Sequence, residues 1–410
     1  MNSLDGDADI DRQVAALSVG CAEILPPGGL REKLRMAAAA GRGLRVKLGV
    51  DPSGSELTLG HAVVLRKLRQ FQDLGHTAVL IVGDFTGRVG DPTGKSATRK
   101  VLTPAETAAN ARDYFDQVMR ILDPDRVEIR HNSEWLEKLP LQTFLTAAMS
   151  LTVAQMLERD DFARRYRENR PISLMEFLYP VLQGYDSVAV RSDIEIGGTD
   201  QTYNNLVGRD LQRDAGQPPQ IVVTMPLLVG TDGVEKMGKS LGNWIALREP
   251  ADDQFGKLMS IPDTAVETYG KLCADLSPDE LATLRTRMTT EPATAKRDLA
   301  ERIVALYHGP GEAAAARERF DKLFARREVP DDVPEFAIAA AGSLDIPDLL
   351  VAAGLAKTKS EVRRLVDQNG IKIDGVALAP GEYSVATGLI DGRVVQRGRR
   401  AAVRVRVTPD

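Results

Sequence analysis

The chain has 410 residues, of which 27% are charged and 43% are hydrophobic, and its formal net charge is −5. This length predicts two or three domains, and the composition is typical of a globular protein rather than a disordered or fibrous one. Two cysteines and four histidines predict neither a disulfide framework nor a structural zinc site. Because the acidic N-terminus lacks a signal-peptide core and no apolar run reaches the roughly 20 residues of a membrane span, we expect a cytoplasmic protein.

Residues 44–84 have the pattern of a strand, a helix and a second strand. Apolar residues alternate in "LRVKLGVD" (44–51), recur at helical spacing in "GHAVVLRKLRQFQDLG" (60–75) and run continuously in "HTAVLIVGD" (76–84). The alternation in 44–51 predicts a strand, and the helical spacing in 60–75 predicts a helix that ends at Gly75. The continuous apolar run in 76–84 predicts a strand that is buried on both faces. Such a βαβ unit predicts a parallel sheet.

A second set of strand, helix and strand is predicted at 192–198, 200–213 and 220–229. The mostly helical segment between the two sets, roughly 103–185, indicates an insertion between two halves of one sheet. Residues 250–330 have a helical, charged pattern, and the Pro- and Asp-rich stretch 329–336 predicts a linker. The tail predicts two short helices and then strands, with Asn-Gly and Asp-Gly turns around a short alternating strand.

The tail also differs in charge from the rest of the chain. Residues 343–410 hold 11 Lys and Arg against 8 Asp and Glu, a net charge of +3, which leaves −8 on the rest. A small basic domain on an acidic body favours a polyanionic partner, although an ordinary solvated face would give the same composition.

The stretch "VGDPTGKSATRK" (89–100) differs by one position from a phosphate-binding P-loop. That motif requires a glycine five positions before Gly94, and the chain has Val89 there. The difference argues against a P-loop kinase and leaves open whether the stretch binds phosphates in another way or is a surface turn.

Two other segments suit nucleotide chemistry. "DPSGSELTLGH" (51–61) follows a predicted strand and opens a predicted helix, so its backbone N–H groups, the helix dipole and His61 could meet ATP phosphates. "VEKMGKS" (234–240) places Lys236 and Lys239 in a glycine-containing loop, where two ammonium groups suit the charge that builds on a departing pyrophosphate. Either segment alone would be an ordinary surface feature, and together they indicate a nucleotide site.

These segments resemble the HIGH and KMSKS signatures of class I aminoacyl-tRNA synthetases, as "TLGH" and "KMGKS". With "GDFTGRVGDPTGKSATRK", "YPVLQGYDS" and "EIGGTDQTYN", they occur in the order and spacing of bacterial tyrosyl-tRNA synthetases, and the tail resembles the RNA-binding S-four domain. The resemblance implies an α/β architecture with a Rossmann-like parallel-sheet catalytic domain. It assigns an N-terminal helical extension and this domain to 1–240, a helical dimerisation insertion to about 130–180, an α-helical anticodon-side domain to 241–330 and an α+β S-four-like domain to 343–410.

The activity implied by the resemblance is the ligation of L-tyrosine to tRNA(Tyr) by a homodimer, with ATP as substrate and Mg²⁺ as cofactor. The carboxylate of tyrosine would attack the α-phosphorus of ATP, and a ribose hydroxyl of the tRNA would then take the tyrosyl group. Catalysis would rest on positioning and on stabilisation of phosphate charge, with no side-chain nucleophile.

The resemblance also assigns the tyrosine-binding residues. Asp186 would accept the phenolic hydroxyl, Tyr179, Gln183 and Asp91 would hold the α-ammonium group, and Gln201 would lie near the carboxylate. The spacing of Tyr179, Gln183 and Asp186 independently places all three on one face of a helix.

Nucleotide, catalytic and tRNA contacts follow from the same resemblance. The implied ATP-binding residues are Asp51, Ser53, Gly60, His61, Gly198, Asp200 and Lys239. The residues expected to stabilise the transferring phosphates are Thr58, His61, Lys95, Arg99, Lys236 and Lys239. The residues expected to bind tRNA are Lys357, Lys359, Arg363 and Arg364.

Three positions depart from the family pattern. Thr58 replaces the first histidine of HIGH, Gly238 replaces the serine of KMSKS, and Lys47 stands where many tyrosyl enzymes have a tyrosine that contacts the substrate hydroxyl. The last change is associated with a second bacterial subgroup, and it leaves open how the other side of the phenol is recognised. A specialised duplicate synthetase, for antibiotic resistance or secondary metabolism, and a non-catalytic RNA-binding paralogue remain alternatives.

Overall fold

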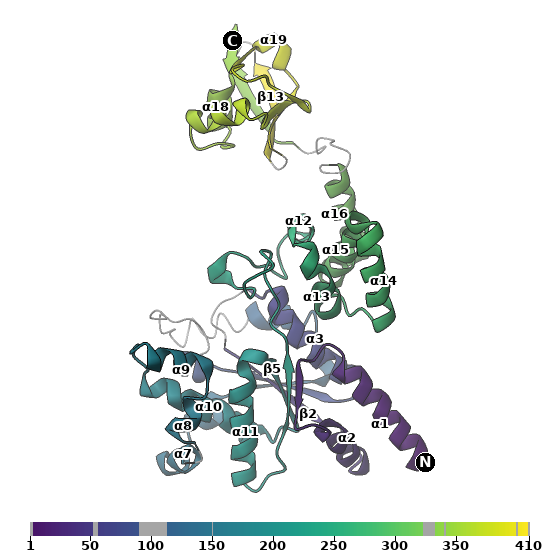
Figure 1. Cartoon of the computed structure of the whole chain (residues 1–410), viewed down its shortest axis with the longest axis vertical. Coiled ribbons are helices and arrows are strands. Elements are labelled where there is room, and N and C mark those ends of the chain that lie inside the picture. The colour runs from purple at the N-terminus through teal and green to yellow at the C-terminus, as the bar shows by residue number, and fades with distance from the viewer. Residues whose placement is uncertain are drawn as a thin grey trace. The chain divides into compact units, whose positions relative to one another are not determined.

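The computed structural model describes residues 3–51, 56–89, 113–149, 151–322, 333–339, 342–398 and 401–408 (Figure 1). The chain divides into two compact units, one of residues 1–250 with 257–307 and the other of residues 251–256 with 308–410. The three domains expected from the sequence, with boundaries at 240 and 330, stay a prediction.

A six-stranded sheet lies at the centre of the first unit, in the order β1-β6-β5-β2-β3-β4. Its strands are β1 (Glu23–Leu25), β2 (Arg45–Val50), β3 (Thr77–Val82), β4 (Val127–His131), β5 (Ile194–Gly198) and β6 (Ile221–Met225). Every neighbouring pair is parallel except β1 with β6, so the predicted parallel sheet is confirmed. The winding of the chain reverses between β2 and β5, and ligands of open α/β sheets bind at the carboxyl ends of the strands at such a point.

Helices surround this sheet and continue beyond it. The α-helices up to the end of the first unit are α1 (Ser3–Ser18), α2 (Gly29–Ala39), α3 (Leu59–Asp73), α4 (Thr86–Val89), α6 (Ser133–Leu136), α7 (Leu141–Ala148), α8 (Val153–Met156), α9 (Asp160–Arg167), α10 (Leu174–Val190), α11 (Thr202–Asp214), α12 (Ala251–Ser260), α13 (Asp263–Cys273), α14 (Pro278–Thr290) and α15 (Pro292–His308). In the described part of the chain, short 3₁₀ turns occur at η1 (Pro124–Arg126), η2 (Thr199–Gln201) and η3 (Lys239–Leu241). The helix expected from residue 200 begins at Thr202, because η2 occupies the first turn.

The insertion between the sheet halves packs on α10 and α11. Figure 1 shows α7, α8 and α9 gathered beside these two helices in the teal part of the chain. Val181, Val207 and Leu211 form a buried cluster there, against which Phe144 of α7 packs. This packing fixes α10, whose inner face carries three of the predicted tyrosine-binding residues, against the sheet.

Strand β2 does not have the half-exposed character that a period of two suggests. Val46, Lys47 and Leu48 are all buried, so both faces of the strand are covered. Lys47 is buried because α10 lies over its face of the sheet and accepts hydrogen bonds from its ammonium group, at Gln183 O and Ser187 Oγ. Lys47 is therefore part of an internal contact between β2 and α10.

The second unit contains a small α+β fold. Its five-stranded sheet has the order β10-β9-β12-β13-β7, and β8 pairs with β11 in a separate two-stranded sheet. The strands are β7 (Glu335–Ala339), β8 (Ser343–Asp345), β9 (Ile371–Ile373), β10 (Val376–Ala377), β11 (Ser384–Ala386), β12 (Val394–Arg397) and β13 (Ala401–Thr408). The helices are α16 (Pro310–Phe320), α17 (Ile346–Ala352), α18 (Lys359–Asp367) and α19 (Thr387–Ile390). Asp374 and Gly375 both have positive φ, 45° and 82°, between β9 and β10, as the predicted Asp-Gly hairpin turn requires.

No helix among the described residues is both long enough and apolar enough to cross a membrane.

Candidate active site

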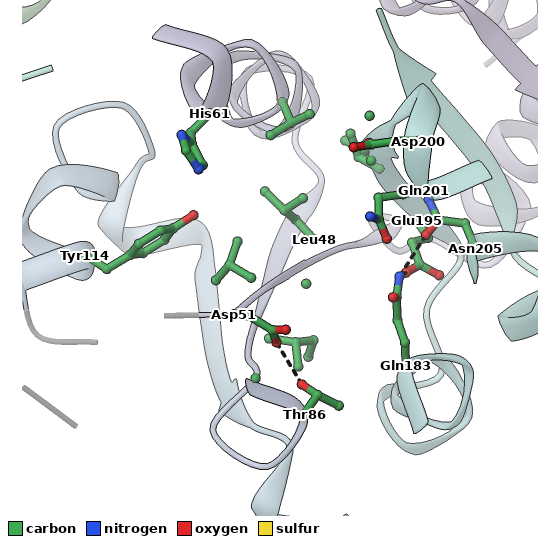
Figure 2. Close-up of a pocket in the computed structure, with 18 of the residues that line it drawn as sticks. Leu48, Asp51, His61, Thr86, Tyr114, Gln183, Glu195, Asp200, Gln201 and Asn205 are labelled. Carbon is green, nitrogen blue, oxygen red and sulfur yellow. Dashed lines mark hydrogen bonds between the residues drawn. The ribbon is translucent and has the colours of Figure 1, made fainter. Parts of the chain in front are cut away.

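A cleft of about 620 Å³ opens at the carboxyl ends of β2 and β5. In Figure 2, His61 and Tyr114 face Gln183, Gln201 and Asn205 across this cleft, with Asp51 between them. The predicted site residues that line the cleft are Asp51, Thr58, His61, Tyr179, Gln183, Asp186, Gly198, Asp200, Gln201, Lys236 and Lys239. The fold thus brings together residues from 51 to 239 that the sequence assigned to two substrates.

Other predicted site residues lie elsewhere. Gly60 does not line the cleft, and a Cβ added to it would lie 3.8 Å from Cβ of Met237 in the "KMGKS" loop. The second unit contains Lys357, Lys359, Arg363 and Arg364. Ser53, Asp91, Lys95 and Arg99 lie outside the described residues.

Asp186 lies in the part of the cleft formed by α10, β4 and α6. Its carboxylate accepts hydrogen bonds from Nε1 of Trp135 at 2.8 Å and from Nδ2 of Asn132 at 3.4 Å. Burial raises the pKa of Asp186 to about 7, against the opposing effects of the Lys47 ammonium group and these two donors. A carboxylate accepts up to about four hydrogen bonds, so Asp186 has capacity left for a hydroxyl donor.

A chain of hydrogen bonds joins Asp186 to the other side of the cleft. Asn132 Nδ2 also donates to Thr86 Oγ1 at 2.9 Å, Thr86 donates to Asp51 Oδ1 at 2.8 Å, and the Tyr179 hydroxyl donates to Asp51 Oδ2 at 2.9 Å. Asp51 can lie here only because residue 83 is glycine, since a Cβ there would be 1.9 Å from Asp51 Oδ1. Asp51 therefore contacts a predicted tyrosine-binding residue, although the sequence assigned it to the nucleotide.

Amide side chains form the wall near the carboxyl end of β5. Asn204 Nδ2 donates to Oε1 of both Gln183 and Gln201, at 3.2 and 3.0 Å, and Gln183 Nε2 donates to Asn205 Oδ1 at 3.1 Å. The guanidinium group of Arg159, from the loop between α8 and α9, donates to Asn204 Oδ1 at 3.2 Å. The insertion thereby reaches the residues predicted to hold the ammonium and carboxylate groups of the amino acid.

Beneath this wall, Lys47 and Glu195 form a buried ion pair. Lys47 Nζ lies 2.9 Å from Glu195 Oε1, and the two side chains are 0% and 1% exposed. The residues are direct neighbours in the parallel pairing of β2 with β5. Breaking a fully buried pair by removing one partner leaves an uncompensated charge, so each residue depends on the other.

Thr58 and His61 form the start of α3. The Thr58 backbone N–H donates to His61 Nδ1 at 3.2 Å, so the ring proton of the neutral imidazole is on Nε2. The ring is exposed to the cleft, yet the surrounding cleft walls and the Lys239 ammonium group lower the pKa of His61. A neutral His61 with its Nε2–H free of this contact suits donation to a phosphate oxygen.

Asn243 holds the "KMGKS" loop in place. Its buried side chain donates to Asp232 Oδ2 at 2.7 Å and to the Lys236 carbonyl at 3.2 Å, and it accepts from the Gly238 N–H at 2.9 Å. Beyond the loop, backbone bonds tie the chain to the start of α3, from Leu59 N to Ile245 O and from Leu247 N to Leu57 O. The two signature segments are thus joined through the backbone.

The charged groups of this loop line the cleft near Asp200. Both lysine side chains are exposed, and Lys236 Nζ lies 3.4 Å from Asp200 Oδ2. Partial enclosure lowers the pKa of Lys239, while Glu56 opposes this change. Gly198 is the last residue of β5, and a Cβ there would lie 2.7 Å from Asp200 Oδ1 and 2.9 Å from Leu227 Cδ2. A side chain at residue 198 would therefore displace the ends of the Asp200 and Leu227 side chains.

The basic residues predicted to bind tRNA are exposed and lie in or next to α18 of the second unit. Lys359 forms an ion pair with Asp348, and the guanidinium carbon of Arg363 lies 5.9 Å from the centre of the Tyr383 ring. Arg364 lies in the last turn of α18.

Several site residues were missed from the sequence. Thr86, Tyr114, Asn132, Glu195 and Asn205 line the cleft. Asn132 directly follows the carboxyl end of the parallel strand β4, where the topology rule for ligand sites applies, and that rule could have identified it. Nothing local to the sequence points to Tyr114 or Asn205.

Comparisons with known proteins identify the family of the chain. The model of the tRNA synthetases class I (W and Y) family matches residues 39–325, and the S4 domain model matches residues 346–382. A tyrosine–tRNA ligase of Moorella thermoacetica is 48% identical over 402 residues, covering 97% of each chain. One of Thermotoga maritima is 50% identical over 366 residues, covering 88% of this chain and 90% of the relative.

Solved structures show the same fold. A C-terminally truncated mitochondrial tyrosyl-tRNA synthetase of Aspergillus nidulans has a TM-score of 0.63 at 22% identity, covering 78% of this chain and 98% of that one. A tyrosyl-tRNA synthetase of Archaeoglobus fulgidus, complexed with L-tyrosine, has a TM-score of 0.60 at 20% identity, covering 75% and 100%. The family match spans more than half of the chain and includes every predicted residue that lines the cleft. The chain therefore belongs to the class I tRNA synthetases of the tryptophan and tyrosine family and carries an S4 domain.

Proposed function

We propose that this protein is a tyrosine–tRNA ligase that forms tyrosyl-adenylate from L-tyrosine and ATP and then charges tRNA(Tyr). The observation that carries the choice of tyrosine over phenylalanine is the buried Asp186 carboxylate, with donors on two sides and capacity for a third. A phenolic hydroxyl supplies that donor. Phenylalanine would leave the acceptor unpaired, and a site built to bond a hydroxyl rejects an analogue that lacks it.

In the proposed complex, the amino acid lies along α10 with its ring toward Asp186. The Tyr179 hydroxyl, the Gln183 amide and Asp51 lie toward the other end, where the α-ammonium group needs acceptors. Asp91, which lies outside the described residues, is proposed to complete this set, and Gln201 is proposed to orient the carboxylate.

ATP is proposed to occupy the cleft between α3 and the "KMGKS" loop. His61 would donate from Nε2 to a phosphate oxygen, with Thr58 holding the ring, and Asp200 and Gly198 would border the ribose. Lys236 and Lys239 would stabilise the negative charge on the departing pyrophosphate, with Lys95 and Arg99 joining them from residues that are not described. Ser53 and Gly60 are proposed nucleotide contacts by resemblance only.

Mg²⁺ is proposed to enter with ATP. The residues that the structure describes include no group of three or more His, Cys, Asp or Glu side chains that could hold a metal. The ion would supply positive charge to the phosphates of ATP, and the roles of the side chains above do not depend on it.

We propose a homodimer formed through the insertion. Large apolar side chains are exposed on α7 to α10 and their loops: Leu141, Leu145, Met149, Val153, Tyr166, Leu174 and Met175. Such a concentration of apolar surface is typical of a protein–protein interface. A second copy of the chain is proposed to cover this apolar surface. The double variant Met149→Asp/Leu174→Asp tests this proposal, because it should sediment as a monomer, whereas the control Val376→Asp in the second unit should sediment as the unaltered protein does.

We further propose that the tRNA is bound by Lys357, Lys359, Arg363 and Arg364. The S4 match and the exposed basic side chains in and next to α18 support this assignment. We also propose that the three predicted domains carry the adenylation, anticodon-side and S4 functions, and that the enzyme acts in the cytoplasm. The test of the whole function is ATP–pyrophosphate exchange with tyrosine, phenylalanine and tryptophan in parallel, followed by charging of total tRNA. Exchange led by tryptophan would contradict the role of Asp186.

A further inference from the structure

The pair formed by Lys47 and Glu195 touches the tyrosine pocket but has no part in the scheme above. Lys47 Nζ makes three contacts: Glu195 Oε1 at 2.9 Å, Ser187 Oγ at 2.7 Å and the Gln183 carbonyl at 3.2 Å. The last two belong to the turn of α10 that also carries Asp186. The ammonium group therefore anchors this turn to the sheet.

Glu195 completes the arrangement from β5. Its Oε2 accepts from Ser187 Oγ at 3.1 Å and from Gln220 Nε2 at 2.5 Å, and its Oε1 also lies 3.4 Å from Gln183 Nε2. Both carboxylate oxygens are thus bonded, and Ser187 bridges the two charges. These hydrogen bonds to the Glu195 oxygens help to offset the cost of removing the ion pair from water.

The two charges act on Asp186 in opposite directions. Among the described groups, Lys47 and Glu195 are the charged residues that affect Asp186, and Trp135 and Asn132 are its neutral donors. The attraction of Lys47 has the larger effect and favours the carboxylate form of Asp186, while Glu195 disfavours it. Water screens both effects only weakly, because all three side chains are buried.

We propose that the Lys47–Glu195 pair is a specificity-determining element of the amino-acid pocket, which anchors the Gln183–Ser187 turn to the sheet and acts on Asp186 within that turn. Its consequence for tyrosine selection rests on the proposed function. Lys47 and Glu195 are positioning residues, since they act on the substrate through Asp186 and Gln183.

The test uses the full chain and four variants. Glu195→Gln removes the negative charge and leaves Lys47, Lys47→Met removes the positive charge and leaves Glu195, and the double variant removes both. Ser187→Ala is the matched control, because it deletes hydrogen bonds to both members without changing charge. The first readout is an infrared titration of the Asp186 carboxyl in ligand-free protein, with Asp186→Asn subtracted. The second is the pH profile of kcat/KM for tyrosine in pyrophosphate exchange.

The two single variants should move the titration of Asp186 in opposite directions. Glu195→Gln should move it, and the acid limb of the profile, to lower pH by about one pH unit, and Lys47→Met should move both to higher pH by a similar amount. The double variant should lie between them, and Ser187→Ala should leave the midpoint in place. Equal displacement in both single variants, no displacement, or an equally large effect of Ser187→Ala would overturn the proposal.

Two further outcomes are distinguishable. If Lys47→Met does not fold, the remaining single variants still test the proposal, because Glu195→Gln should lower the titration midpoint of Asp186 and Ser187→Ala should leave it unchanged. If the unaltered protein shows no tyrosine-dependent exchange, the proposed function fails, while opposite displacements in the infrared titration still support the electrostatic role of the pair. Normal exchange with an unmoved infrared titration in every variant overturns the pair's role alone.

Discussion

The hydroxyl of Tyr179 donates to Oδ2 of Asp51 at 2.9 Å, which joins the middle of α10 to the carboxyl end of β2 across the base of the cleft. Thr86 bonds the other oxygen of Asp51, so the carboxylate is held from two sides. A side chain fixed in this way would be preorganised for the ammonium group proposed above, because no rotamer has to be selected when a ligand arrives.

Tyr179→Phe should raise the KM for tyrosine by about 3- to 10-fold, which corresponds to the loss of one ordinary hydrogen bond. The KM for ATP should stay nearly constant. Pyrophosphate exchange at varied tyrosine and varied ATP measures both. Tyr383→Phe is the matched control, because it removes a hydroxyl bonded to Asp367 in the second unit. A raised KM for ATP with an unchanged KM for tyrosine would contradict the assigned role.

Asp186→Asn should reduce the preference for tyrosine over phenylalanine by about 10- to 100-fold, since a hydrogen bond to a charged acceptor is lost. Because burial raises the pKa of Asp186 to about 7, kcat/KM for tyrosine in the unaltered protein should rise between pH 6 and pH 8. In the variant this rise should disappear. Exchange assays with both amino acids across this range measure the two effects, and a profile that persists in Asp186→Asn would assign it to another group.

The same residue should affect stability with a defined sign. The folded-state pKa of Asp186, about 7, lies above the ordinary value of 3.8, so the folded protein binds this proton more tightly than the unfolded chain does. Stability is therefore lost as pH rises from about 4 to about 7. Asp186→Asn does not lose this stability. The free energy of unfolding of the variant minus that of the unaltered protein should therefore be larger at pH 8 than at pH 5, by about 1–3 kcal/mol. Urea unfolding at both values measures it, and a gain confined to pH 5 would show the opposite sign.

Lys239→Ala should lower the rate of adenylate formation by about 100-fold or more while tyrosine affinity stays nearly unchanged. The reason is that the ammonium group is proposed to meet charge that exists only as pyrophosphate departs. Stopped-flow measurement of adenylate formation, with equilibrium binding of tyrosine, separates the two quantities. Lys138→Ala, an exposed lysine that does not line the cleft, serves as the control. A large loss of tyrosine binding would count against the proposed role.

Replacing Arg363 and Arg364 together by alanine should lower the charging of tRNA and leave tyrosine-dependent pyrophosphate exchange intact. The side chains are exposed on α18 of the second unit, whereas the cleft belongs to the first. Each lost phosphate contact should also reduce the salt dependence of tRNA binding by about one in the slope of log K against log salt. Filter binding at several salt concentrations measures this slope, and an unchanged slope would remove these residues from the interface.

Much of the fold could be predicted from local patterns. The strand–helix–strand pattern of 44–84 corresponds to β2, α3 and β3, because its apolar periods are long and uninterrupted. The face that unites Tyr179, Gln183 and Asp186 could also be predicted, since helical spacing determines it. These features depend on residues close together in the chain.

Lys47 shows where such reasoning stops. Its position in an alternating strand suggests a polar, exposed face, yet it is fully buried. Its counter-charge is 148 positions away along the chain, and only the pairing of β2 with β5 brings the two together. Asn243 is a similar case, because its role depends on the folded path of the "KMGKS" loop. Long-range pairing of polar groups has no local signature.

The facing positions of Lys47 and Glu195 also restrict how this pocket can change over generations. Exchanging either residue alone leaves a buried charge without its partner, at a cost of about 3–5 kcal/mol, which is a large share of the stability of an ordinary protein. A lineage can lose this ion pair only through a destabilised single mutant or through two nearly simultaneous substitutions. Positions 47 and 195 should therefore be inherited as a unit, with an uncharged residue at one accompanied by an uncharged residue at the other.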